Sequence, residues 1–185
     1  GEPAPFEAIV DTALALGAPV VRGWAGKLGS DQADAAYWDQ VIADSRRIAD
    51  LAAAAGLEVA YEFHGHTLTD TNAAARKLLE AVAHPAVKSY WQPRGLSLSE
   101  AMESLDTVYP WLAHIHVFAW REMDRQPERL PLAAGATLWP QILARAAQDG
   151  REHYAMIEFV LNDEPSQFLE DAKVLAAWLQ HYPIH

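Results

Sequence analysis

The chain has 185 residues, half of them apolar, which is enough to bury the core of one compact domain. It carries 25 acidic and 14 basic side chains, and a formal net charge of -11 disfavours nucleic-acid binding because phosphate backbones are repelled. The absence of cysteine excludes disulfides and cysteine-bound metals, and no apolar run reaches the roughly 20 residues of a membrane span.

Short segments rich in Val, Ile, Tyr and Phe alternate along the chain with longer segments rich in Ala and Leu that have helical spacing. A first helix is expected at residues 6–16, where Gly17 ends it as glycine often does. Five strand–helix pairs follow, with a polar loop at 120–137. The expected strands are 19–24, 57–63, 87–91, 112–118 and 153–160; the expected helices are 31–55, Thr69 or Asp70 to 82, Ser97 or Ser99 to Pro110, 139–148 and 164–181.

Strict alternation of strands and helices predicts parallel strands joined by crossover helices. An open doubly wound sheet and a closed barrel both satisfy that pattern. A complete (β/α)8 barrel has eight units and about 250 residues. Because this chain has five units and begins in mid-pattern, we expect residues 1–185 to be one domain, the C-terminal part of such a barrel. It would be an engineered truncation, a proteolytic fragment or a naturally shortened form.

Polar side chains stand at the end of each predicted strand, where a buried strand would ordinarily carry none. The C-terminal ends of parallel strands converge on one face of the fold, so these side chains are expected to meet there. They are Arg22, Glu62, His64, Gln92, His114, His116 and Glu158.

Glu62, Gln92, His116 and Glu158 have the donor atoms of a divalent metal site. Carboxylates and imidazole suit a hard or borderline divalent ion, which would polarise a substrate carbonyl or a pair of hydroxyls. The carboxylates would also move a proton at the carbon beside the carbonyl, as aldose–ketose isomerisation and epimerisation require.

Each of these residues, taken alone, also has a structural interpretation. A single strand-end Glu is as often an ion-pair partner, and a single strand His is more often a structural hydrogen-bonding group. His114 and His116 share one strand face, so one would belong to the site and the other would support it. Trp24, Trp91 and Trp120 are equally compatible with core packing and with a platform for the face of a sugar. The occurrence of these polar residues at the ends of successive strands favours a functional site over the structural interpretations.

At these residues the sequence resembles the xylose-isomerase-like TIM-barrel superfamily, which includes sugar-phosphate isomerases, ketose 3-epimerases, inosose dehydratases and endonuclease IV type repair enzymes. The resemblance covers nearly the whole chain and corresponds to the last five strands of that barrel. The matching motifs are Glu62 followed by Thr69-Asp70-Thr71-Asn72, then Ile115-His116-Val117, then Leu132-Ala133-Ala134-Gly135, and finally Glu158.

The resemblance implies a sugar, sugar-phosphate or polyol isomerase or epimerase that uses Mn²⁺, Mg²⁺, Co²⁺ or Zn²⁺. Glu62 and Glu158 would be the acid and base, and both would also bind the metal together with Gln92 and His116. The residues expected to bind substrate are Arg22, Trp24, His64, Arg94, His114 and Trp120, with the two arginines holding a phosphate or carboxylate.

This chain departs from the family pattern at two places. Gln92 stands where the family usually has Asp, and a neutral amide binds a metal more weakly than a carboxylate does. The acidic residue that often follows the His motif is replaced by Phe118-Ala119-Trp120. The expected affinity for metal is therefore low.

Three other functions compete with isomerisation. A dehydratase-type lyase would use the same metal and base. An endonuclease IV type nuclease is disfavoured by the acidic charge and by the single clear ligand histidine, His116. A non-catalytic remnant would expose sheet edges that could pair with another copy of the chain. We expect a cytoplasmic protein with a small sugar as its partner and no membrane or nucleic-acid partner.

Overall fold

The structure is a computed structural model that describes residues 5–93, 97–121, 127–180, 182 and 184. The chain divides into two compact units, residues 1–90 with 110–112 and residues 91–109 with 113–185. Among the described residues, no helix combines the length and the apolar character that a bilayer span requires.

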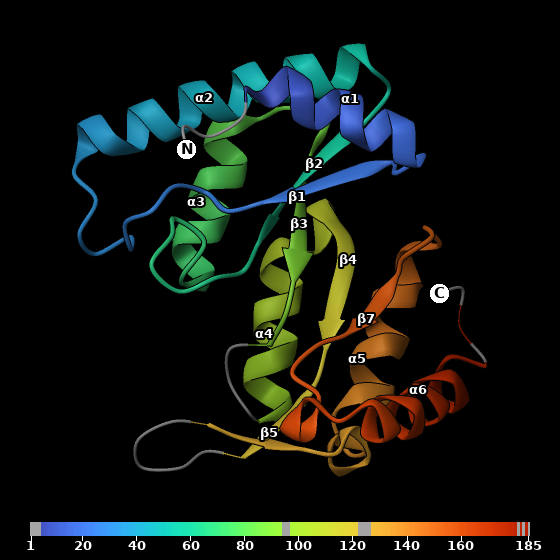
Figure 1. The fold of residues 1–185 in the computed structure, drawn as a ribbon. Coiled ribbons are helices and arrows are strands. Elements are labelled where there is room, and N and C mark those ends of the chain that lie inside the picture. The colour runs from blue at the N-terminus through green and yellow to red at the C-terminus, as the bar shows by residue number, and fades with distance from the viewer. Residues whose placement is uncertain (1–4, 94–96, 122–126, 181, 183, 185) are drawn as a thin grey trace. The chain divides into compact units, whose positions relative to one another are not determined.

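The first unit contains strands that pair in parallel in the order β1-β2-β3, with α2 and α3 as the crossovers between them and α1 preceding β1. Helices α1 and α2 pack against each other and over the β1–β2 pair (Figure 1). The parallel pairing that the sequence pattern predicted is therefore confirmed here. In chain order the elements are α1 (Phe6–Leu16), β1 (Val20–Gly23), α2 (Ala35–Ala54), β2 (Glu58–Glu62), α3 (Asn72–Val82) and β3 (Val87–Trp91).

In the second unit β4 and β7 pair in parallel, and β5 and β6 form a separate antiparallel hairpin. Helix α6 packs against both α5 and β7 (Figure 1). After β3 the chain forms α4 (Leu98–Val108), a 3₁₀ turn (Tyr109–Trp111), β4 (Leu112–Val117), β5 (Ala119–Arg121), β6 (Glu128–Leu130), a 3₁₀ turn (Leu132–Gly135), α5 (Trp139–Ala146), a 3₁₀ turn (Ala147–Asp149), β7 (Ala155–Ile157), a 3₁₀ turn (Leu161–Asp163) and α6 (Pro165–Leu179).

Two helix starts, those of α2 and α3, differ from the sequence-based expectation. Helix α2 begins at Ala35 rather than near residue 31, because the Asp34 side chain accepts a hydrogen bond from the Tyr37 N–H and caps the helix. Helix α3 is capped by Thr71, not by Thr69 or Asp70. For α4 the expected cap at Ser97 is confirmed.

The region from 120 to 137 is not the uninterrupted loop that its polarity indicated. It contains β6 and a 3₁₀ turn, and β5 begins just before it. The last strand is also shorter than expected, because β7 ends at Ile157. Phe159 has a positive φ of 55°, a conformation that no extended strand can contain.

Apolar side chains fill the interior of each unit. In the first unit the Tyr61 hydroxyl donates to Ser45 Oγ at 2.7 Å inside the core, and burial raises the pKa of Tyr61 to about 12. In the second unit Trp91 and Trp139 are completely buried, and Trp91 Nε1 donates to Ser104 Oγ at 3.0 Å. Trp91 is thus a core residue and not a platform for a sugar.

Leu105 on α4 is fully buried, so truncating it should destabilise the second unit. The Leu105→Ala substitution removes apolar contacts and leaves a cavity, which costs about 3 kcal/mol of unfolding free energy. Urea unfolding measures this loss. The matched control is Leu16→Ala, at a leucine that is 77% exposed and whose truncation should cost less than about 0.5 kcal/mol. Equal losses in the two variants would contradict the assignment of Leu105 to the core.

Candidate functional site

Glu62 ends strand β2 with a buried carboxylate held by two donors from the neighbouring strand β1 and the residue that follows it. Arg22 Nη1 forms an ion pair with Glu62 Oε2, and Trp24 Nε1 donates to the same oxygen at 2.8 Å. The Glu62 side chain is only 4% exposed, whereas that of Arg22 is 47% exposed. The arginine compensates the charge of a carboxylate that would otherwise be costly to bury.

His64 lies two residues beyond Glu62 and stacks on Trp24. The two rings are 4.2 Å apart between centroids and tilted by 26°. His64 Nδ1 lies 2.7 Å from the Gly65 carbonyl oxygen. Because a carbonyl oxygen only accepts, Nδ1 carries the hydrogen, and in the neutral ring Nε2 holds the lone pair. This contact therefore identifies Nε2 as the nitrogen of the partly exposed His64 ring that can accept a proton.

In the second unit the side chains of Gln92, His116 and Glu158 meet around one atom. His116 Nδ1 lies 3.0 Å from Gln92 Oε1 and 3.2 Å from Glu158 Oε2. His116 is buried, with 6% of its surface exposed, because it occupies the penultimate position of β4. Three of the four predicted metal ligands are therefore brought together within this unit.

The donor atoms of this cluster fit a divalent cation. An amide oxygen, an imidazole nitrogen and a carboxylate oxygen are the ligand types that Mg²⁺, Mn²⁺ and Zn²⁺ take in proteins. Their separations of 3.0 and 3.2 Å match those between neighbouring ligands of one ion. Gln92 and His116 add no negative charge, so within this unit the carboxylate of Glu158 supplies the electrostatic attraction.

Three aromatic side chains near the end of β4 pack together and form an aromatic wall: Phe118, Trp120 and Phe159, which follows Glu158 in the chain. Trp120 lies 4.5 Å from Phe118 and 4.8 Å from Phe159, measured between ring centroids. Arg129 lies over the Phe159 ring and forms an ion pair with Asp163. Trp120 is thus packed against other rings, whereas Trp24 is 55% exposed and better placed to meet a ligand.

His114 and Arg94 are the remaining predicted substrate-binding residues. Phe159 was not singled out from the sequence. His114 Nδ1 accepts a hydrogen bond from the backbone of Tyr154 and meets that ring edge-on, so it joins β4 to β7. Arg94 lies outside the described residues. Phe159 gave no polar signal in the sequence, and its place in the wall depends on a left-handed backbone conformation that no motif indicates.

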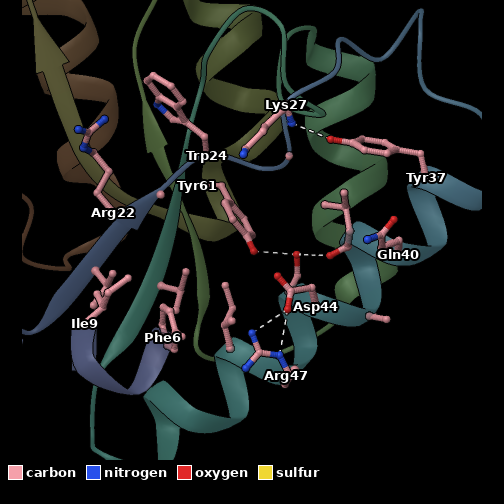
Figure 2. Close-up of a pocket in the computed structure, with 18 residues that line it drawn as sticks. Phe6, Ile9, Arg22, Trp24, Lys27, Tyr37, Gln40, Asp44, Arg47 and Tyr61 are labelled. Carbon is pink, nitrogen blue, oxygen red and sulfur yellow. Dashed lines mark hydrogen bonds and ion pairs between the residues drawn. The ribbon is translucent and has the colours of Figure 1, made fainter. Parts of the chain in front are cut away.

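A cavity of about 790 Å³ lies in the first unit between α1, α2 and the outer face of β1 and β2 (Figure 2). Tyr61 lines it, and Tyr61 points to the face of β2 opposite to that of its neighbour Glu62. Its polar lining groups largely bond to one another, as Asp44 does to Arg47 and the backbone of Lys27 to Tyr37. The cavity therefore does not receive the carboxylate of Glu62.

Comparison with known proteins identifies the family. The model of the xylose isomerase-like TIM barrel family matches residues 4–178. The chain belongs to this family. Its α/β fold is thus a partial barrel of the (β/α)8 type with about five C-terminal βα units, as the alternation of elements predicted.

A curated relative is the 3-dehydroshikimate dehydratase of Bacillus anthracis, 24% identical over 176 residues. That match covers 84% of this chain and 61% of the relative, so the chain spans about three fifths of the relative's length.

Solved structures with the same fold are similar over nearly the whole chain at low sequence identity. The probable 3-DHS dehydratase AsbF of Bacillus anthracis has a TM-score of 0.77 at 23% identity, covering 92% of this chain and 68% of that one. A xylose isomerase-like TIM barrel protein from Mycobacterium smegmatis, in complex with magnesium, has a TM-score of 0.76 at 21% identity, covering 94% and 65%. A D-tagatose 3-epimerase-like protein has a TM-score of 0.69 at 14% identity, covering 94% and 67%.

Proposed function

We propose that this chain contributes to a metal-dependent enzyme that removes a proton from the carbon beside a carbonyl group of a hydroxylated substrate and then expels water. The observation that carries the proposal is the convergence of Gln92 and Glu158 on His116 Nδ1. His116 is buried, and a buried polar side chain on which an amide and a carboxylate converge at a strand end is typical of a ligand or metal site.

Gln92, His116 and Glu158 would hold the metal, and we propose Glu62 as the fourth ligand. Glu62, His116 and Glu158 each offer one ligand atom. When bound, the ion supplies a positive charge that polarises the substrate carbonyl and stabilises the negative charge that develops on its oxygen.

His64 is proposed as the general base. Its Nδ1–H bond to the Gly65 carbonyl leaves Nε2 as the proton acceptor, and its ring is held on Trp24. Glu62 is not assigned the role of base in this proposal, because its Oε2 already bonds to Arg22 and Trp24. His64 Nε2 would take the proton and the C–H electron pair would form a carbon–carbon double bond. The protonated His64 would return that proton to the hydroxyl on the next carbon, which would leave as water with the electron pair of its C–O bond.

Isomerisation or epimerisation of a sugar is the second candidate, because it begins with the same proton abstraction. The fold similarity to a D-tagatose 3-epimerase-like protein supports it, while the curated relative's name supports dehydration. We place dehydration first because epimerisation in this family would use Glu62 and Glu158 as acid and base. The Glu62 carboxylate already forms an ion pair with Arg22. A small sugar or cyclic polyol ketone is the proposed partner in either case.

Incubation of the protein with Mn²⁺ and either 3-dehydroshikimate or D-tagatose tests both candidates. Proton NMR in D2O detects exchange at the carbon beside the carbonyl, and ultraviolet absorbance detects the conjugated product of dehydration. We expect exchange and absorbance with 3-dehydroshikimate. Exchange or epimer formation with D-tagatose alone would favour the second candidate, and a Mn²⁺-loaded protein that catalyses neither reaction would contradict the proposal for these substrates.

A further inference from the structure

Two buried threonines in the loop after β2 bond to the backbone of Glu62 and of His64. Thr69 Oγ1 donates to the Glu62 carbonyl at 2.6 Å, and Thr67 Oγ1 donates to the His64 carbonyl at 2.7 Å. Both threonines are 2% exposed. The backbone of the proposed metal ligand and that of the proposed base are thus each fixed by a hydroxyl group.

The two hydroxyl groups also lie side by side, and the backbone N–H of Thr69 links them because each hydroxyl hydrogen is already donated to a carbonyl group. Thr67 Oγ1 and Thr69 Oγ1 are 2.9 Å apart, and the Thr69 N–H donates to Thr67 Oγ1 at 3.2 Å. Glu62 and His64 are therefore connected through a chain of hydrogen bonds that bypasses the intervening backbone at Phe63.

The loop itself is anchored to the segment after β1, which carries Trp24. The Leu68 N–H donates to the Ala25 carbonyl at 2.9 Å, and the Ser30 N–H donates to Asp70 Oδ2 at 2.8 Å. Leu68 is fully buried. The loop also contains His66 at a positive φ of 59°, a conformation that costs energy in a residue other than glycine. Rigid anchoring of a strained loop beside a site is typical of preorganisation.

We propose that Thr67 and Thr69 are positioning residues that set the Glu62 carboxylate and the His64 imidazole relative to each other. This inference rests on the proposed function for its catalytic consequence, but the positioning itself concerns the structure of the first unit alone. Loss of the Thr69 bond should displace Glu62, whose carboxylate receives Trp24 Nε1. Loss of the Thr67 bond should displace the ring of His64 instead.

The first test reads the position of Glu62 without metal or substrate. The indole N–H of Trp24 donates to Glu62 Oε2, so its NMR resonance, assigned with Trp24→Phe, reports on that bond. Thr69→Val should shift this resonance, and Thr69→Ser, which keeps the hydroxyl, should restore it. The matched control is Ser45→Ala, which removes another buried hydroxyl of the same unit. An unshifted resonance in folded Thr69→Val would overturn the inference.

The second test measures catalytic consequences in the complete protein. Thr69→Val should weaken Mn²⁺ binding about tenfold, because the loss of a group that supports a metal ligand commonly lowers metal affinity by this factor. Thr67→Val should leave Mn²⁺ binding within twofold and lower kcat about tenfold at unchanged KM. Ser45→Ala should change thermal stability only. Equal Mn²⁺ affinity and kcat in all three variants would refute the positioning role, whereas a wild-type protein that binds no Mn²⁺ would contradict the proposed function while the indole resonance still tests the positioning.

Discussion

Glu158→Gln is expected to abolish Mn²⁺ binding and to lower turnover at least a hundredfold. Within the described part of the second unit, Glu158 places its carboxylate beside His116 Nδ1, and its loss leaves Gln92 and His116 there as neutral ligands. Glu62, the other carboxylate of the proposed ligand set, already shares its charge with Arg22. A cation bound mainly through neutral oxygen and nitrogen atoms loses most of its electrostatic attraction. The measurements are the shift in melting temperature with Mn²⁺, which mass action converts to affinity, and proton exchange from substrate in D2O.

Glu170→Gln on helix α6 is the matched control for this substitution. It removes the same charge from the same unit at an exposed side chain that pairs only locally with Lys173. Its melting-temperature shift with Mn²⁺ and its turnover should equal those of the wild type. A Glu158→Gln protein that still binds Mn²⁺ and exchanges substrate protons would remove Glu158 from both roles.

The complementary substitution, Gln92→Asp, would distinguish a site with weakened metal affinity from a site that no longer binds metal. The resemblance to the family led us to expect low metal affinity, because Gln92 replaces the usual aspartate. The structure nevertheless holds Gln92 Oε1 3.0 Å from His116 Nδ1, where the proposed site needs a ligand oxygen. If Gln92 is a ligand, Gln92→Asp adds a negative charge at that position and should tighten Mn²⁺ binding, as measured by the shift in melting temperature.

The sequence predicted the fold because alternating apolar patterns depend on local spacing. The five parallel strands and their helices were located within a few residues, since period two and period 3.6 are set by backbone geometry alone, whereas the short hairpin strands β5 and β6 were missed. The predicted contacts around His116 were accessible for the same reason, because parallel strands must place their C-terminal residues at one edge. Glu158 was found even though β7 ends before it, because its backbone N–H still donates to the Val117 carbonyl and continues the ladder.

The sequence pattern did not predict which partner each site residue bonds to. Arg22 was expected to bind substrate, but in the structure it is paired with Glu62, and which of two acceptors an arginine takes depends on distances that no pattern contains. Thr69 appeared only as part of a family motif and as a possible helix cap, and Thr67 was not singled out at all. Their bonds to carbonyl groups require the compact turn at His66, whose left-handed conformation has no sequence signature outside glycine and asparagine.

A cluster of charged groups at the beginning of β7 should govern the acid stability of the second unit. His153 is 1% exposed and contacts the Ala113 carbonyl through one ring nitrogen and Asp149 through the other. Arg151 bonds to the Asp149 carboxylate and donates to the Tyr109 carbonyl at 3.0 Å. Partial burial acts to raise the pKa of Asp149, but the bonds from Arg151 and from His153 outweigh it and hold that pKa below its ordinary value.

Asp149→Asn is therefore expected to cost about 2 kcal/mol of unfolding free energy at pH 7, the typical worth of hydrogen bonds to a charged group. A lowered pKa in the folded state means that the carboxylate contributes stability above its unfolded pKa of about 3.9 and loses it as the pH falls. The difference between wild type and variant in urea unfolding should accordingly shrink as the pH is lowered below about 4. Asp163→Asn, at a carboxylate whose side chain is 81% exposed, is the control and should change stability by less than about 0.5 kcal/mol. A difference for Asp149→Asn that stays constant down to pH 3 would show that the loss comes from packing and not from the charge.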